Sequence, residues 1–223
     1  MKKTLLLLLL FIAGIASAQK YVPFPTENAE WNINYTTGTY GLPTSSYLKQ
    51  YSLHGDTVIN NITYRKLCTN IGTVSNPVYK GMGGLREQDK KIYYLGANYS
   101  GNNSYTGNQE VLLYDFNKVV GEEVVINNYT SYTITKIDSV KIGSSYRKRY
   151  NDRIIEGIGD VQEGLLGMIT PRFTCMECIY NWQFICFSQN GESIYKNRDY
   201  VDCESTKKWS EVKYLNDNTC WTN

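Results

Sequence analysis

Apolar and polar residues alternate along much of the chain, a pattern typical of strands that bury one face. Trp31, Ile33 and Tyr35 alternate with polar residues, and this period of two predicts a half-buried strand. Glycine, asparagine and aspartate separate the alternating segments, which indicates short turns between antiparallel strands rather than helical crossovers. Further strands are predicted within 57–64, 85–94, 110–116, 122–126, 131–140, 145–155, 182–187 and 193–195.

Two residue pairs predict tight hairpin turns. Asn60-Asn61 lies between two apolar segments, and asparagine tolerates a positive φ better than most residues. Asn190-Gly191 is the strongest hairpin signal in the chain, and a two-residue turn there would place Phe187 opposite Ile194. Strand pairs are also predicted around 89–90, 117–121 and 143.

Residues 146–167 have the most distinctive pattern in the chain. A strand with alternating basic residues is followed there by four closely spaced glycines. Glycine at this density is needed where the backbone takes a positive φ or passes close to another chain. We expect this segment to redirect the chain between two halves of a sheet. The glycines are Gly157, Gly159, Gly164 and Gly167.

These strands and turns predict a single all-β domain over residues 19–223. We expect an antiparallel meander of about eight to ten strands that forms a curled, barrel-like sheet. A two-sheet sandwich is the alternative. The curled sheet is favoured because closing it, or nearly closing it, removes edge strands that an exported protein would expose to aggregation.

Residues 1–18 have the pattern of a secretory signal peptide. Two lysines precede an apolar run over 5–15, and Ala16-Ser17-Ala18 supplies the small residues of a cleavage site. The run is shorter than the ~20 residues of a membrane span. The sequence therefore predicts a mature chain that begins at Gln19 and is secreted, periplasmic or on the cell surface, with no membrane span after cleavage.

The charge balance argues against nucleic acid and anionic membranes as partners. Removing Lys2 and Lys3 from the 23 basic residues leaves 21, against 21 acidic residues, so the exported chain would carry no net charge. Without a basic excess, long-range attraction to nucleic acid or to an anionic membrane is not favoured. We therefore expect no nucleic-acid partner.

All six cysteines follow the predicted cleavage site, and an even number in an oxidising compartment predicts up to three disulfides. Cys186 and Cys203 flank the turn at 190–191 and form the favoured pair. The other four pair among themselves, so we expect the part from about residue 172 onward to be tied by disulfides. No second Cys-x2-Cys motif follows the one at 175–178, which argues against a zinc site. The four are Cys68, Cys175, Cys178 and Cys220.

Five segments stand out for their order along the chain: GDTVINNITYRKL (55–67), GGLREQDKKIYYL (83–95), VLLYDFNKVVGEEV (111–124), RIIEGIGDVQEGLLG (153–167) and ICFSQNGESIY (185–195). Together they resemble an uncharacterised family of secreted Bacteroidetes β-domains, and the resemblance covers most of the chain after residue 18. Members are often the leading module of proteins exported by type IX secretion. The resemblance implies a secreted β-domain and carries no activity or catalytic residue with it.

Three carboxylates lie within eight residues, at Glu156, Asp160 and Glu163. Glycoside hydrolysis needs two carboxyl groups about 5 to 10 Å apart, so this cluster supports an alternative function as a secreted hydrolase of polysaccharide or peptide. The glycines between them favour solvated turn carboxylates instead, because catalytic acids are better held on rigid elements. The spacing does not match a calcium loop, and no metal site is predicted.

The basic strand at 146–150 alternates two kinds of side chain. Arg147 and Arg149 share one face, and Tyr146, Lys148 and Tyr150 share the other. This pattern suits the binding of phosphate or of an acidic glycan, with a solvated strand face as the alternative. The candidate binding residues are Tyr146, Arg147, Arg149, Tyr150, Glu156 and Asp160.

The chain offers little that could catalyse a reaction. His54 is the only histidine and is predicted to be a surface turn residue, because no serine lies in a G-x-S-x-G context. No cofactor is predicted. The 20 Tyr and 4 Trp supply stiff contact surfaces with polar tips. We therefore expect a non-catalytic binding or structural module for a glycan or a cell-surface protein.

Overall fold

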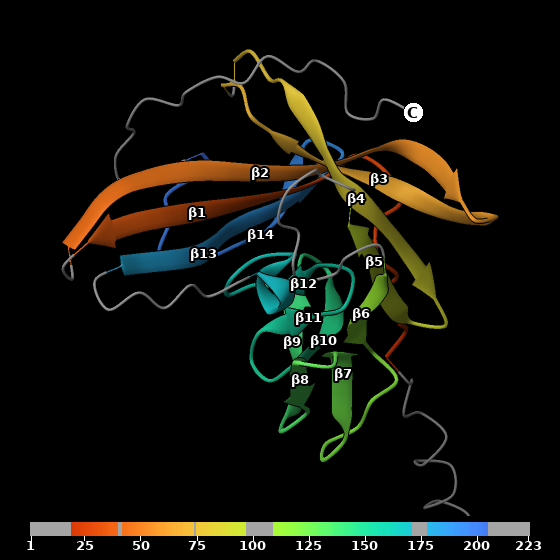
Figure 1. Cartoon of the computed structure of the whole chain (residues 1–223). Helices are drawn as coiled ribbons and strands as arrows, with labels where there is room; N and C mark the ends of the chain where they lie inside the picture. The colour runs from red at the N-terminus through yellow and green to blue at the C-terminus, as the bar shows by residue number, and fades with distance from the viewer. Residues whose placement is uncertain (1–18, 40–41, 74, 97–108, 171–177, 205–223) are drawn as a thin grey trace, which may run out of the picture.

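The computed structural model describes residues 19–39, 42–73, 75–96, 109–170 and 178–204. The described chain is all-β and antiparallel, as predicted, and its only helix is one 3₁₀ turn, η1 (Gly167–Ile169). An eight-stranded sheet curls over two smaller sheets (Figure 1). The predicted signal peptide, residues 1–18, lies outside the described residues.

The large sheet has the strand order β14-β13-β1-β2-β3-β4-β5-β6. Six of its strands follow one another as a meander, and β6 and β14 form its two edges, so the sheet is curled but open. Its strands are β1 (Ala29–Thr39), β2 (Leu42–Ile59), β3 (Ile62–Asn70), β4 (Tyr79–Gln88), β5 (Lys91–Gly96), β6 (Glu110–Asp115), β13 (Cys178–Gln189) and β14 (Glu192–Lys196).

Strand β1 lies inside the sheet because the β13–β14 hairpin, from the C-terminal part of the chain, pairs with the edge of β1 that β2 leaves open. β1 pairs with β2 along one edge and with β13 along the other, with Trp31 opposite both Tyr51 and Phe187. Strands β2, β1 and β13 therefore form a three-stranded ribbon, called the long ribbon, which extends to the left in Figure 1.

The predicted hairpin turns are confirmed. Asn60 and Asn61 have φ of 50° and 61°, and Ile59 lies opposite Ile62, as a two-residue turn requires. Asp89-Lys90 joins β4 to β5 in the same way, with φ of 52° and 59°. Positive φ at both central residues gives a turn whose twist matches that of the strands.

In the β13–β14 hairpin the predicted register holds for the two residue pairs next to the turn and is wrong beyond them. Asn190-Gly191 forms the turn, with Ser188 opposite Ser193. The register then shifts between Phe187 and Ser188, so that Phe187 lies opposite Tyr195 instead of Ile194. One extra residue on β14 accounts for the shift, because a β-bulge sets two residues against one.

Two smaller sheets lie below the large one in Figure 1. The predicted pairing of 110–116 with 122–126 is wrong, because β6 pairs with β5 and β7 pairs with β8. The backbone N–H of Gly121 donates to Ile134 O at 2.7 Å, so the chain leaves the large sheet before β7. The strands are β7 (Glu123–Asn127), β8 (Thr130–Thr133), β9 (Ile137–Ile142), β10 (Ser145–Tyr150), β11 (Ile154–Ile155) and β12 (Gly159–Asp160).

The core lies between the inner face of the large sheet and the β9–β12 sheet. Trp31 is fully buried, and its indole N–H donates to Ile158 O at 2.8 Å. Tyr114 is also fully buried and donates to Leu165 O at 2.5 Å. These two bonds tie the polar tips of core aromatics to the glycine-rich segment, as buried Trp and Tyr require.

A positive φ is confirmed at three of the four glycines of the glycine-rich segment. Gly157, Gly159 and Gly164 have φ of 71°, 94° and 93°. A Cβ on Gly164 would overlap the Ile33 side chain, so the backbone passes directly over the core side chains of β1. Gly167 instead begins η1. The expectation that the segment joins two halves of one sheet is wrong. The segment contains most of β10 and all of β11 and β12 of the four-stranded sheet and precedes β13 of the separate eight-stranded sheet, where Phe184 N–H donates to Gln162 O at 2.7 Å.

Cys186 and Cys203 form a disulfide, as predicted, with 5.5 Å between their Cα atoms. Cys68 on β3 is buried and is also disulfide-bonded. The side chains of Cys175, Cys178 and Cys220 lie outside the described part of the chain. The pairing of these four cysteines therefore stays a prediction.

Candidate functional site

The structure does not bring the four candidate residues of β10 onto one accessible surface. Tyr146 is 57% exposed, whereas Tyr150 is buried and donates its hydroxyl to Phe116 O at 2.8 Å. Burial raises the pKa of Tyr150 to about 12. Alternation placed both rings on one face correctly, but the strand runs from the sheet surface into the core along its length.

The two arginines of β10 are held by neighbouring groups. Arg149 donates through Nε and Nη2 to both carboxylate oxygens of Asp138, at 2.9 and 2.7 Å. This bidentate pair follows from the β9–β10 register, in which Arg149 lies opposite Asp138. Arg147 is half-buried and donates to Glu156 O at 3.3 Å, and burial lowers the pKa of its guanidinium. Neither arginine extends freely into solvent.

The expectation of solvated turn carboxylates is wrong for two of the three. Glu156 is 2% exposed and Asp160 is fully buried. Asp160 pairs with Arg153 and accepts backbone N–H bonds from Gln162 at 2.8 Å and Glu163 at 3.3 Å. These donors, together with the close chain passage that glycine permits, allow the carboxylate to enter the core.

The carboxylates do not form the open pair that hydrolysis requires. Burial raises the pKa of Asp160, and Arg153 opposes this shift. Burial likewise raises the pKa of Glu156, whose Oε2 accepts the Lys148 N–H at 3.3 Å. Arg153 also lies 3.4 Å from Glu163. Because Asp160 is enclosed with its arginine, it has no exposed surface to present to a polymer.

The interpretation of His54 as a surface turn residue is also wrong. His54 lies within β2, is half-buried, and its Nε2 is 2.7 Å from Ser52 Oγ. Its ring packs on Tyr79 at 4.2 Å between centroids, and burial lowers its pKa. Among the described residues no carboxylate is hydrogen-bonded to His54, so the Ser–His contact lacks the third member of a triad.

A row of three aromatic rings crosses the long ribbon, and the sequence did not reveal it. Tyr35 on β1 lies opposite Tyr47 on β2 and opposite Trp182 on β13. The ring centroid of Tyr35 is 6.4 Å from that of Tyr47 and 4.1 Å from that of Trp182. We call Tyr47, Tyr35 and Trp182 the aromatic row.

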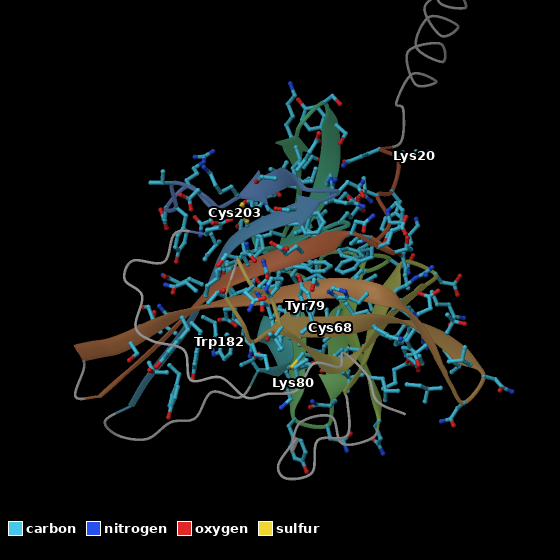
Figure 2. The ribbon with its side chains drawn as sticks, turned by 90° about the horizontal axis from the view of Figure 1, so that it is seen from above. Lys20, Cys68, Tyr79, Lys80, Trp182 and Cys203 are labelled. Atoms are coloured by element: carbon cyan, nitrogen blue, oxygen red, sulfur yellow. A yellow bond between two sulfur atoms is a disulfide. The ribbon has the colours of Figure 1, made fainter. Side chains whose placement is uncertain are left out.

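The aromatic row continues the inner face of the sheet beyond the core. Alternation along β1 puts Tyr35 on the same face as Ile33, which is 1% exposed, yet all three rings of the row are only half-buried. Lys49 Nζ lies 4.7 Å from the Trp182 ring centroid, within cation–π range. Figure 2 shows Trp182 on the extended part of the ribbon. The row is thus a stiff aromatic surface with one cation at its side.

The row depends on a strand pairing that no local pattern signals. The alternation of Tyr35 and Trp182 with polar neighbours fixes the face of each ring, but only the pairing of β1 with β13 sets them side by side. Without knowledge of the strand pairing, many other combinations of aromatic residues are equally compatible with the sequence.

Comparisons with protein families, with curated proteins and with solved structures found no match. No helix in the described part of the chain combines the length and apolar character needed to cross a membrane. Within the same residues, His, Cys, Asp and Glu side chains do not gather in groups of three that could hold a metal ion. The function is therefore inferred from the geometry of this chain.

Proposed function

We propose that this protein is a secreted, non-catalytic binding module that holds a glycan on the aromatic row. The observation that carries the proposal is the alignment of three half-buried rings across three paired strands. Single exposed aromatics are common on protein surfaces. A registered row with ring centroids 4.1 and 6.4 Å apart is a surface of defined shape, and such a surface suits a ligand of matching shape.

The physical fit is with the face of a sugar ring. One face of a pyranose is made largely of C–H groups, and the hydroxyls at its rim form hydrogen bonds. Because Tyr35 and Trp182 stack on each other at 4.1 Å between centroids, this C–H face would lie across the outward edges of the row rather than on the face of a single ring. Tyr and Trp offer this contact area at a small cost in side-chain entropy and have polar tips for the hydroxyls. Strands lie about 4.8 Å apart, so the row is roughly 10 Å long and has room for more than one sugar ring.

Lys49 adds a charge preference to the aromatic row. Its ammonium group lies 4.7 Å from the Trp182 centroid and 5.4 Å from that of Tyr51, so its position is set by two rings. An ammonium at the side of the row can donate to hydroxyl or carboxylate oxygens of a stacked sugar. This arrangement favours a neutral or acidic glycan over a basic one.

The alternative of a secreted hydrolase receives less support. It requires Glu156 with Asp160 or Glu163 to line a cleft, and the enclosure of Asp160 by Arg153 removes one of these groups from contact with solvent. Export is part of the proposal, and the Cys186–Cys203 disulfide supports it, because structural disulfides persist in oxidising compartments. The intact mass of secreted material, with a mature chain beginning at Gln19, is the test of export.

Glycan-array binding of the wild type and of Trp182→Ala tests the proposed function. Loss of one stacked ring removes about 1.4 kcal/mol of contact, so we expect about ten-fold weaker binding. Trp182→Phe should recover most of the affinity and shows whether the strand still forms. Tyr146→Ala is the matched control, because Tyr146 is an exposed tyrosine on β10, which belongs to the separate four-stranded sheet.

Two outcomes would contradict the proposed function. If Tyr146→Ala and Trp182→Ala lose binding equally, the aromatic row is not the specific glycan-binding site. Turnover of a polymer that disappears in Glu156→Gln would favour the hydrolase instead. Binding to the array without turnover, sensitive only to changes in the row, is the result that we expect.

A further inference from the structure

A second feature lies on the outer face of the large sheet, opposite the core. A pocket of about 750 Å³ opens where β1 and β2 meet the β13–β14 hairpin. Figure 2 looks onto this side, with Cys203 beside the blue strands and Tyr79 beside the orange ones. The lining residues used below are Glu30, Asn32, Ser52, His54, Tyr79 and Glu204.

The pocket holds a buried acceptor that has no donor. Asn32 is 2% exposed, and its Nδ2 donates to Cys203 O at 3.0 Å. This bond fixes the orientation of the amide, because only the nitrogen can donate to a carbonyl. Asn32 Oδ1 then remains buried without any hydrogen-bond partner. Buried acceptors are nearly always paired in folded proteins, so this oxygen is available to accept a hydrogen bond from a molecule that enters the pocket.

The charge of the pocket indicates what kind of donor it takes. Glu30 and Glu204 both line it, and the described residues that line it include no lysine and no arginine. The local potential therefore favours a cation. A metal ion fits less well than an organic cation, because the described carboxylate, histidine and cysteine side chains do not form a group of three here.

One wall of the pocket is aromatic and rigid. The His54 and Tyr79 rings pack at 4.2 Å between centroids, and Ser52 Oγ holds His54 Nε2 at 2.7 Å. Burial lowers the pKa of His54, so its imidazole is neutral near pH 7 and does not repel a cation. Aromatic faces beside carboxylates are the surroundings in which organic cations bind.

We propose that this pocket binds the primary ammonium group of a small ligand. The ammonium donates one N–H to Asn32 Oδ1 and lies between the carboxylates of Glu30 and Glu204, with its carbon stem against the Tyr79 and His54 rings. The site is independent of the aromatic row, because Asn32 and Tyr35 point to opposite faces of β1. Both an amino sugar and a free alkylamine carry this group.

Calorimetric titration of the full mature chain with ethanolamine, glucosamine and glucose tests the proposal, at a pH where both amines are protonated. We expect binding of both amines and none of glucose. Binding of glucosamine without ethanolamine also supports the ammonium site and identifies an amino sugar as its source. Equal binding of glucose and glucosamine, or no binding of either amine, would overturn it.

Removing one negative charge from the pocket tests whether the amines bind there. Glu30→Gln preserves side-chain shape and removes one negative charge, so we expect at least about ten-fold weaker amine binding. Glu192→Gln is the matched control, since Glu192 is exposed on β14 and does not line the pocket. Wild-type affinity in Glu30→Gln would overturn the proposal. Trp182→Ala should bind amines normally, which separates failure here from failure of the aromatic row.

Discussion

Gly164 has φ of 93° and lies directly against Ile33, so Gly164→Ala meets two separate penalties. A left-handed backbone costs alanine about 1 to 2 kcal/mol relative to glycine. Forcing the new methyl group against a packed core side chain costs about 1 to 3 kcal/mol more. We expect the free energy of unfolding to fall by about 2 to 5 kcal/mol, measured by urea denaturation with tryptophan fluorescence.

Gly121→Ala separates these two penalties. Gly121 has nearly the same backbone conformation, with φ of 96°, but a Cβ there would have no atom within 4 Å. We expect this variant to lose only the backbone contribution of about 1 to 2 kcal/mol. The difference between the variants measures the close passage of the glycine-rich segment over β1. If Gly164→Ala is no less stable than Gly121→Ala, the segment does not pack on Ile33 as described.

Three further changes test other parts of the structure. Replacing both Cys186 and Cys203 by alanine should lower the free energy of unfolding by about 3 kcal/mol, because the disulfide closes a loop with a sequence separation of 17; an unchanged urea midpoint would contradict this. Asp160→Asn should cost about 3 kcal/mol by removing the buried carboxylate partner of Arg153, which then keeps only the longer 3.4 Å contact with Glu163. Arg153→Leu in addition should recover part of the loss. Burial raises the pKa of Glu156 above its value in the unfolded chain, so the folded protein disfavours the ionised carboxylate. The free energy of unfolding therefore declines as pH rises through the pKa of Glu156 in the folded state. Glu156→Gln should therefore be more stable than the wild type in urea at pH 7, and the difference should vanish at acid pH.

The hairpins were predictable because their signals are short in range. Asn60-Asn61 and Asn190-Gly191 adopt positive φ, and the residues that tolerate this conformation can be found in the sequence directly. The register after a turn is less secure. A single bulge moved the partner of Phe187 from Ile194 to Tyr195, and no residue type marks that bulge.

The depth of each side chain was much harder to predict than its face. A period of two put Tyr146 and Tyr150 together, yet one is exposed and the other is in the core. Alternation reports direction only, whereas depth depends on what packs above the strand. Similarly, Asp160 was expected in solvent because the sequence does not show that Arg153 folds back onto it. Burial of a polar group depends on partners that the fold brings against it.

Strand β1 explains why one chain segment serves two proposed sites. Its odd-numbered side chains run from the buried Trp31 and Ile33 to the half-buried Tyr35, and thus from the core to the aromatic row. Its even-numbered side chains include Glu30 and Asn32, which line the pocket on the other face. Since β1 pairs with β2 and β13 at once, both sets are held by ladder hydrogen bonds on two sides. A ligand on one face therefore has no steric contact with a ligand on the other, and each site can be changed and measured by itself.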